Sequence, residues 1–366
     1  MSADRYAQRR NKLVRLMRQS GVDTLLVTNF RNVTYLTGFR GDDSYLLVSK
    51  GHTILLSDGR YTTQIADECP GLEAEIRSQS ESLTKVVARL VGKMGVSQLG
   101  IEADSMTVAG WNTLSSAAKS LTLVPVASLV EQLRVVKDAG EIREIREAVT
   151  QAERGFDLLK ASLTAEMTEL QAAHELEHGM RRFGAVESSF DPIVAVGSQA
   201  ALPHARPGNR RMSEAPFVLI DWGATNPGGY RSDLTRVLGT GKISSKLESL
   251  YGVVLKAQLQ GIAAVHPGAR CCDVDRAARQ VIEEAGYGKQ FNHGLGHGIG
   301  LDIHEGPRLN SATETELQPG MVVTVEPGVY LPGWGGIRIE DDVLVTKDGC
   351  EVLTSVPKEL ESLNIC

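Results

Sequence analysis

Four acidic residues of this chain lie within or at the end of otherwise apolar, strand-like segments. They are Asp221 in VLIDWGA, Asp233 in GGYRSDLTR, Glu326 in VVTVEPGVY and Glu340 in GGIRIEDDVLV. A buried carboxylate is costly unless it is paired or binds a metal. One such acid fits a structural salt bridge equally well, whereas four of them favour a shared cation.

A glycine-rich stretch supplies histidines that could complete such a site. FNHGLGHGIGLDIHEGPR, residues 291–308, contains His293, His297 and His304 among five glycines, and glycine lets a backbone bend closely around a ligand. Four carboxylates balance two divalent ions, and the neutral imidazole of His297 adds a fifth ligand. Two metals about 3.5–4 Å apart can generate a hydroxide nucleophile at neutral pH. A set rich in oxygen and without thiols favours manganese, cobalt, iron or zinc over copper.

A second candidate is HELEH, residues 174–178, which matches the H-E-x-x-H pattern of zinc peptidases letter for letter. Thr168 followed by Gln171 predicts a capping box and a helix from 169 to about 182. At about 100° per residue, both histidines lie opposite the predicted buried stripe of Ala172, Ala173, Leu176, Met180 and Phe183. Zinc ligands need a dehydrated, supported environment. We therefore predict that HELEH is a solvated helix face.

Composition and charge exclude several classes of function. The chain has 366 residues and a net charge of -6, which gives no reason to expect nucleic acid or an anionic membrane as partner. No apolar run approaches the roughly 18 residues of a membrane span, and the charged, amphipathic start lacks the apolar core of a signal peptide. Five cysteines without a C-x-x-C pair predict free thiols in a reducing cytoplasm.

The elements expected around these residues fall into two regions. Residues 1–132 contain the β-rich runs TLLVTN, YLLVSK and TILLSD, a possible strand at 101–104, and amphipathic helices, a pattern typical of a mixed α/β domain. The charged stretch 133–159 begins a long helix. Seven of the eight histidines lie beyond residue 170, so we expect the chemistry in the second region, 133–366.

Together these residues resemble the pita-bread metallopeptidases, which include methionine aminopeptidase, prolidase, aminopeptidase P and the metal-free relative creatinase. The resemblance covers nearly the whole chain. LVTNFRNVTYLTGFRGDDSYLLV and LLSDGRYTTQ resemble the N-terminal domain of the prolidase, aminopeptidase P and creatinase branch, and LRVVKDAGEI resembles its inter-domain junction. The resemblance implies an α/β (α+β) fold. A creatinase-like N-terminal domain, 1–132, would precede a pita-bread catalytic domain, 133–366, with pseudo-two-fold halves.

The same resemblance implies the functional residues. The family's two metals are held by Asp, Asp, His, Glu and Glu, which match Asp221, Asp233, His297, Glu326 and Glu340. The histidines that hold substrate and shuttle protons match His204, His293 and His304, and the arginine beside the last glutamate matches Arg338. Two divalent ions, with manganese expected first and cobalt, zinc or iron as alternatives, and a homodimer are implied as well.

One interval departs from the family pattern. Asp221 and Asp233 are twelve residues apart, one more than the family has. The extra residue lies in the turn-like stretch TNPGG, which a hairpin loop can absorb. The departure therefore concerns the turn more than the ligands.

The implied reaction is hydrolysis of the bond between an N-terminal residue and proline in dipeptides or short peptides, with a metal-bridging hydroxide as nucleophile. His204 or His304 would help to polarise the carbonyl, and Glu326 would pass the proton onward. Arg308 either neutralises the carboxylate of a dipeptide or pairs with a nearby acid, so dipeptidase and aminopeptidase both stay open. The alternatives are a creatinase-like C–N hydrolase without metal and a non-catalytic peptide-binding module.

Overall fold

The chain divides into two units, Met1–Arg134 and Val135–Cys366. The computed structural model describes residues 2–360. Within that range no helix combines the length and apolar character needed to cross a membrane. The cysteines at 69, 271, 272 and 350 are free, as predicted, and Cys366 lies outside the described residues.

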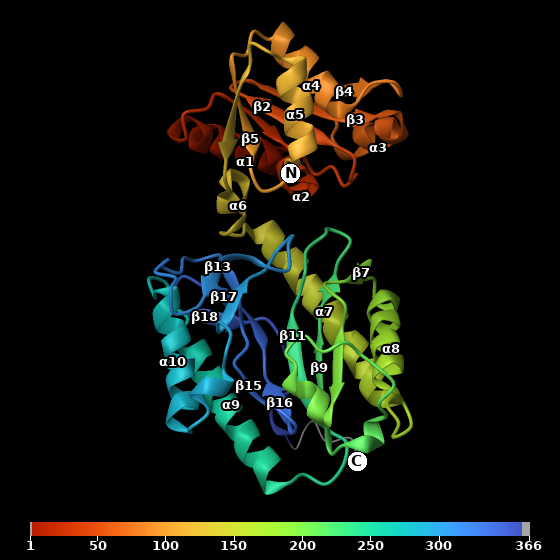
Figure 1. The fold of residues 1–366 in the computed structure, drawn as a ribbon, viewed down its shortest axis with the longest axis vertical. Helices are drawn as coiled ribbons and strands as arrows, with labels where there is room; N and C mark the ends of the chain where they lie inside the picture. The colour runs from red at the N-terminus through yellow and green to blue at the C-terminus, as the bar shows by residue number, and fades with distance from the viewer. Residues whose placement is uncertain (1, 361–366) are drawn as a thin grey trace. The chain divides into compact units, whose positions relative to one another are not determined.

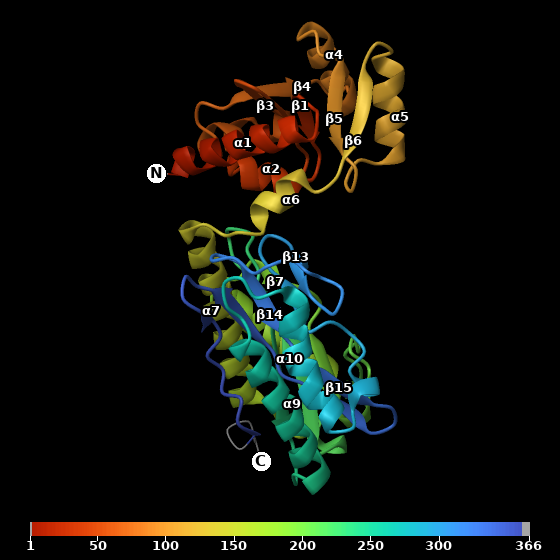
Figure 2. The ribbon, with the colours of Figure 1, turned by 90° about the vertical axis from the view of Figure 1, so that its left-hand side faces the viewer.

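A six-stranded mixed sheet forms the first unit. Its strands are β1 (Thr24–Val27), β2 (Tyr45–Ser49), β3 (His52–Asp58), β4 (Glu73–Arg77), β5 (Gln98–Glu102) and β6 (Thr122–Val126), in the order β4-β3-β2-β1-β5-β6. Its helices are α1 (Ser2–Gln19), α2 (Phe30–Thr37), α3 (Thr62–Glu68), α4 (Leu83–Lys93), α5 (Val108–Ala117) and α6 (Leu129–Arg134). Figure 2 shows α1 and α2 on one face of the sheet and α4 and α5 on the other. The mixed α/β prediction is confirmed, although the strand predicted at 101–104 begins earlier, at Gln98.

Two halves of similar construction form the second unit, each with a pair of helices and an antiparallel sheet. The first half contains α7 (Ala139–Ser162), α8 (Glu169–Arg182), β7 (Glu187–Ser188), β8 (Ile193–Val196), β9 (Phe217–Trp222), β10 (Ala224–Thr225) and β11 (Leu234–Gly239). The second contains α9 (Ser245–Ala263), α10 (Cys271–Glu284), β12 (Gly296–Gly298), β13 (Glu305–Leu309), β14 (Val322–Val325), β15 (Gly328–Leu331), β16 (Gly335–Arg338), β17 (Asp341–Val345) and β18 (Cys350–Val352). In Figure 1 the two helix pairs lie on opposite sides of the strands.

A continuous apolar core joins the two halves and fixes the strands that carry the acidic residues. The buried side chains of β8, β9, β11, β14 and β17 belong to one cluster with those of α7 to α10. Trp222, at the end of β9, stacks on Phe156 of α7 with ring centroids 4.2 Å apart and donates its indole N–H to the Ala152 carbonyl. The end of β9, next to Asp221, is therefore held rigidly against α7.

The long hairpin between β9 and β11 absorbs the extra residue noted above. Thr235 lies opposite Asp221 in the antiparallel register, and the turn closes through the Asn226 side chain, which accepts from the Tyr230 N–H at 2.9 Å. Gly229 takes the left-handed backbone conformation, with φ of 82°, that this turn requires. Both aspartates consequently stay at the same end of the hairpin.

One predicted strand is interrupted. The sequence predicts a single strand across GGIRIEDDVLV, but β16 ends at Arg338 and β17 begins at Asp341. Between them Glu340 makes an isolated antiparallel bridge to Thr235. The strand changes partners at this point, because β16 pairs with β15 and β17 pairs with β14.

Candidate metal centre

A cavity of about 750 Å³ in the second unit brings the predicted site residues together. All ten of them line it: His204, Asp221, Asp233, His293, His297, His304, Arg308, Glu326, Arg338 and Glu340. They come from strands and loops spread over more than 130 positions of the chain. The fold therefore assembles in one place a set of side chains that the sequence keeps apart.

The cavity is layered from a buried floor to an open mouth. Asp221, Asp233, His297, Arg338 and Glu340 are buried, His293 and Glu326 are half-buried, and His204, His304 and Arg308 are exposed. The floor thus contains four of the five predicted metal ligands and Arg338. The three residues at the mouth are ones that we predict to contact substrate.

The strands place the ligand-type side chains within a few ångströms of one another. Asp233, His297 and Glu340 each offer one atom to a group whose members all lie within 4.8 Å. His297 Nε2 lies 3.7 Å from Asp233 Oδ2 and 3.4 Å from Glu326 Oε1. Glu326 follows β14 directly, and its backbone N–H donates to the Leu295 carbonyl. The cluster can hold a cation between carboxylate oxygens and an imidazole.

Local hydrogen bonds prepare His297 as a neutral ligand. Its Nδ1 lies 3.1 Å from the Gly298 carbonyl, so Nδ1 carries the proton and Nε2 is free to bind a metal. Burial, with His304 nearby, lowers the pKa of His297 to about 3. The Thr324 hydroxyl accepts from the His297 backbone N–H at 3.0 Å, which fixes the position of the residue.

The cavity brings four carboxyl groups close together in a largely buried place, which disfavours their ionised forms. Burial, reinforced by the neighbouring carboxylates, raises the pKa of Asp233 and of Glu340 well above their usual range. Burial also raises the pKa of Glu326 to about 8 and raises the pKa of Asp221 in spite of the adjacent Arg338. Without a cation the ionised forms of these groups are therefore disfavoured, whereas bound metal ions would stabilise them.

Two unsatisfied oxygens test whether the residues fit a metal. Across the described part of the chain, few buried side-chain oxygens lack a hydrogen-bond partner, and Asp221 Oδ1 and Glu340 Oε1 are among them. Such oxygens are costly when nothing binds them. Both oxygens belong to predicted ligands that line the cavity. The residues present therefore fit divalent metal ions with oxygen-rich coordination.

Arg338 links the floor to the half-buried histidine. Its Nη2 pairs with Asp221, and its Nη1 donates to the Tyr330 hydroxyl at 2.8 Å. The Tyr330 oxygen lies 3.0 Å from His293 Nε2, whose Nδ1 faces the Gly294 carbonyl. The Gly294 carbonyl can only accept, so the proton of a neutral His293 lies on Nδ1 and Nε2 accepts from the Tyr330 hydroxyl. Burial lowers the pKa of His293 to about 4.

Three residues of the site were missed by sequence reasoning: Thr235, Tyr330 and Asp342. Thr235 donates to Glu340 Oε2 at 2.6 Å, and Asp342 accepts from the Asp233 backbone N–H at 3.1 Å. Tyr330 stands four residues beyond Glu326 on β15. All three lie in motifs that the sequence had already marked, but their roles depend on pairing between distant strands.

The α8 helix bears out most of the HELEH prediction. The capping box of Thr168 and Gln171 is present, and His174 and His178 are exposed. Ala172, Ala173, Leu176 and Met180 are buried as predicted. Phe183 was wrongly assigned to the stripe, because it caps the helix and is 37% exposed.

The glycines on either side of His297 are required by close strand packing, whereas we had expected them to let the backbone bend around a ligand. A Cβ on Gly296 would lie 2.0 Å from the Thr324 carbonyl oxygen, and one on Gly298 would lie 2.1 Å from the Gly306 oxygen. The close neighbour in each case is the backbone of an adjacent strand. Glycine is required here so that β12 can pack between β13 and β14.

Comparison with known proteins identifies the family. Residues 143–347 match the model of metallopeptidase family M24, and residues 9–136 match that of the creatinase/prolidase N-terminal domain. The uncharacterized peptidase YqhT of Bacillus subtilis is 39% identical, with 95% of this chain and 98% of that protein covered.

Solved structures agree with this assignment. An Xaa-Pro dipeptidase from Bacillus anthracis is 38% identical with a TM-score of 0.93, covering 97% of this chain and 99% of that one. An X-Pro aminopeptidase from Thermotoga maritima is 35% identical with a TM-score of 0.87, covering 94% and 99%. The predicted fold, a creatinase-like domain followed by a pita-bread domain, is thereby confirmed. The chain belongs to metallopeptidase family M24 and is a metallopeptidase.

Proposed function

We propose that this metallopeptidase uses two divalent metal ions to hydrolyse the bond between an N-terminal residue and proline in dipeptides or short peptides. The names of the two structural neighbours, an Xaa-Pro dipeptidase and an X-Pro aminopeptidase, support this substrate class. The observation that carries the proposal is the convergence of five ligand-type side chains in one cavity, with a buried, unpartnered oxygen on each of Asp221 and Glu340.

The proposed ligands are Asp221, Asp233, His297, Glu326 and Glu340. Their four carboxylates balance the charge of two divalent ions. Manganese is the metal that the family resemblance favours, with cobalt, zinc or iron as alternatives. Bound ions would lower the pKa of a water molecule and polarise the scissile carbonyl. The protein's contribution is to hold these ligands in a cavity whose geometry is fixed by strand pairing.

Two glutamates of the set have different proposed tasks. Glu326 is half-buried and faces the cavity, so it would accept the proton of the attacking water and pass it to the proline nitrogen. Glu340 is buried and its carboxylate accepts from Thr235, so it would stay fixed as a ligand. His204 and His304 at the mouth would orient the substrate carbonyl, and His293 and Arg338 would complete the wall that holds the substrate.

The lining of the cavity suits a proline-containing peptide. Phe190, Ile193 and Pro203 form apolar lining beside the charged floor, which matches a pyrrolidine ring next to a reacting carbonyl. Arg308 is exposed at the mouth and would pair with the free carboxylate of a dipeptide. An aminopeptidase that accepts longer peptides would leave Arg308 without that task.

A panel of X-Pro dipeptides and X-Pro-Y tripeptides, each assayed with Mn²⁺, Co²⁺ and Zn²⁺, tests the proposal. We expect cleavage before proline with at least one metal, and the ratio of dipeptide to tripeptide turnover separates dipeptidase from aminopeptidase. Absence of X-Pro cleavage with every metal would contradict it. Protein that binds peptide without cleaving it would indicate a binding module, and C–N hydrolysis without metal would indicate a creatinase-like enzyme.

The homodimer, the cytoplasmic location and the domain division at 132 and 133 stay predictions alongside this proposal. Sedimentation of the purified chain tests the first, fractionation of cells tests the second, and expression of 133–366 alone tests the third.

A further inference from the structure

Glu340 is held by two consecutive residues of β11 that face opposite sides of the strand. Successive side chains of a strand alternate between its faces. Thr235 therefore reaches toward the cavity, where its hydroxyl contacts the Glu340 carboxylate. Arg236 reaches away from the cavity and contacts the backbone carbonyl of the same glutamate. The two contacts hold Glu340 at both its side chain and its backbone.

The direction of the Thr235 hydrogen bond is determined by its neighbours. Arg338 Nε lies 3.1 Å from Thr235 Oγ1, and an arginine can only donate. The hydroxyl oxygen therefore accepts from Arg338, and its single proton is left for Glu340 Oε2, 2.6 Å away. Glu340 Oε1 has no partner. The threonine thus fixes one oxygen of the carboxylate and leaves the other available to a cation.

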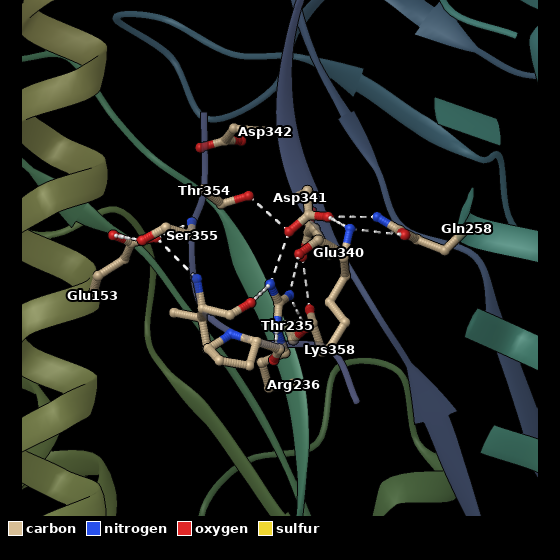
Figure 3. A network of polar contacts seen from close by, with 12 residues as sticks. Glu153, Thr235, Arg236, Gln258, Glu340, Asp341, Asp342, Thr354, Ser355 and Lys358 are labelled. Atoms are coloured by element: carbon tan, nitrogen blue, oxygen red, sulfur yellow. Dashed lines mark hydrogen bonds and ion pairs between the residues drawn. The ribbon is translucent and has the colours of Figure 1, made fainter. Parts of the chain in front are cut away.

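Arg236 is fully buried, and all five of its N–H groups donate (Figure 3). The acceptors are Pro357 O at 3.1 Å, Thr235 O at 2.9 Å, Glu340 O at 2.5 Å, Asp341 Oδ1 at 2.8 Å and Val356 O at 2.7 Å. A lysine has three donors on a flexible stem and cannot reproduce this arrangement.

Residues 354–358 add further contacts to Arg236 and to Asp341, on the face of β11 opposite Thr235. Thr354 donates to Asp341 Oδ1 at 2.7 Å, and Lys358 pairs with Asp341 Oδ2 at 2.5 Å (Figure 3). Gln258 of α9 donates to the same Oδ2 at 2.7 Å. Both carboxylate oxygens of Asp341, the residue after Glu340, thus have hydrogen-bond partners. These contacts lie on the side of β11 away from the cavity.

We propose that Thr235 and Arg236 are positioning residues that set the carboxylate and the backbone of the metal ligand Glu340. The inference rests on the proposed metal site. Groups that orient a ligand typically change metal affinity by about 10- to 100-fold when they are removed. Thr235 holds Glu340 Oε2 and so orients Oε1, the oxygen that is available to a cation. Arg236 holds the backbone carbonyl of Glu340.

Co²⁺ binding to the chelator-treated full chain, followed by calorimetry and by visible absorption, tests the inference. Thr235→Val keeps the shape of the side chain and removes the donor. We expect it to weaken Co²⁺ binding by about 10-fold or more and to change the absorption spectrum. Thr235→Ser keeps the hydroxyl and should restore both to near wild-type values. Arg236→Lys should weaken Co²⁺ binding in the same direction and also lower Tm.

Glu153→Gln is the matched control, because Glu153 anchors Ser355 and Val356 to α7 without contacting Glu340. It should lower Tm and leave Co²⁺ affinity unchanged. Wild-type affinity and spectrum in Thr235→Val would overturn the inference, even where Arg236→Lys fails to fold. If the wild-type chain itself binds no Co²⁺, the proposed metal site fails first, and that outcome is distinguishable from the previous one.

Discussion

The α8 helix and the cavity floor both contain side chains of the types that bind metals, but they differ in burial and in the number of such side chains that lie close together. On α8, His174 and His178 stand one turn apart in a perfect H-E-x-x-H pattern, and both are exposed. In the floor, Asp221 and Asp233 precede Glu340 by more than 100 positions, and all three are buried together. Burial excludes water that would compete with the ligands for a metal. It also makes an ionised carboxylate unfavourable unless a cation binds it. The spacing of residue types alone is a weaker guide than their surroundings.

Removal of a floor ligand should have the largest effect. Asp233→Ala or Glu340→Ala should lower X-Pro cleavage by at least about 100-fold, beyond the range typical of residues that only orient a ligand, while the circular dichroism spectrum stays native. Glu175→Ala, which removes the exposed glutamate of HELEH, is the matched control and should keep activity. Wild-type activity in either floor variant would remove the acid cluster from the reaction.

Removal of the metal should make stability depend on pH in a specific direction. In the metal-free chain the pKa of Glu326 is raised from 4.5 to about 8. Between these values the unfolded chain is ionised while the folded chain keeps its proton, so stability falls as pH rises. We expect chelator-treated protein to lose on the order of a few kcal/mol between about pH 5 and pH 8.

Thermal unfolding with and without chelator measures this effect. Bound metal pairs with the ionised carboxylates, so the loaded protein should show a smaller fall, and the Tm gain from metal should grow with pH. A metal-free Tm that rises across the same interval would show that the floor carboxyl groups are not held in their protonated forms.

A smaller effect is expected at the mouth. If Arg308 neutralises the carboxylate of a dipeptide, Arg308→Ala should raise KM for an X-Pro dipeptide by roughly 10- to 100-fold, the value of a charged hydrogen bond, and leave an X-Pro-Y tripeptide nearly unchanged. Steady-state kinetics on both substrates provides the comparison. A strong dipeptide preference that survives the substitution would exclude Arg308 from this role.

The smallest effect is predicted on α8. Replacing both His174 and His178 with alanine should change X-Pro turnover by less than about twofold, since exposed residues away from a site rarely matter beyond small stability changes. The pair of substitutions is assayed with saturating Mn²⁺ so that only a structural metal on α8 could show an effect. A large loss would reverse the ranking of the two regions.

Much of the fold and of the candidate site could be predicted from the sequence, because local residue patterns mark them. Acids in apolar strands and a glycine-flanked histidine pointed to residues that the fold brings to one cavity, and helical periodicity placed the histidines of α8 in solvent. What escaped depends on contacts between distant strands. The break between β16 and β17, the constraint on Gly296, and the contact of Thr235 with Glu340 over 105 positions have no local signature.

Metal analysis of the full chain purified without chelator distinguishes the acid cluster from α8 as the metal site. We expect two divalent ions per chain in the wild type and in the variant lacking both His174 and His178, and a loss of bound metal in Asp233→Ala. A wild-type chain without metal, or one whose metal is lost with the α8 histidines and kept in Asp233→Ala, would contradict it.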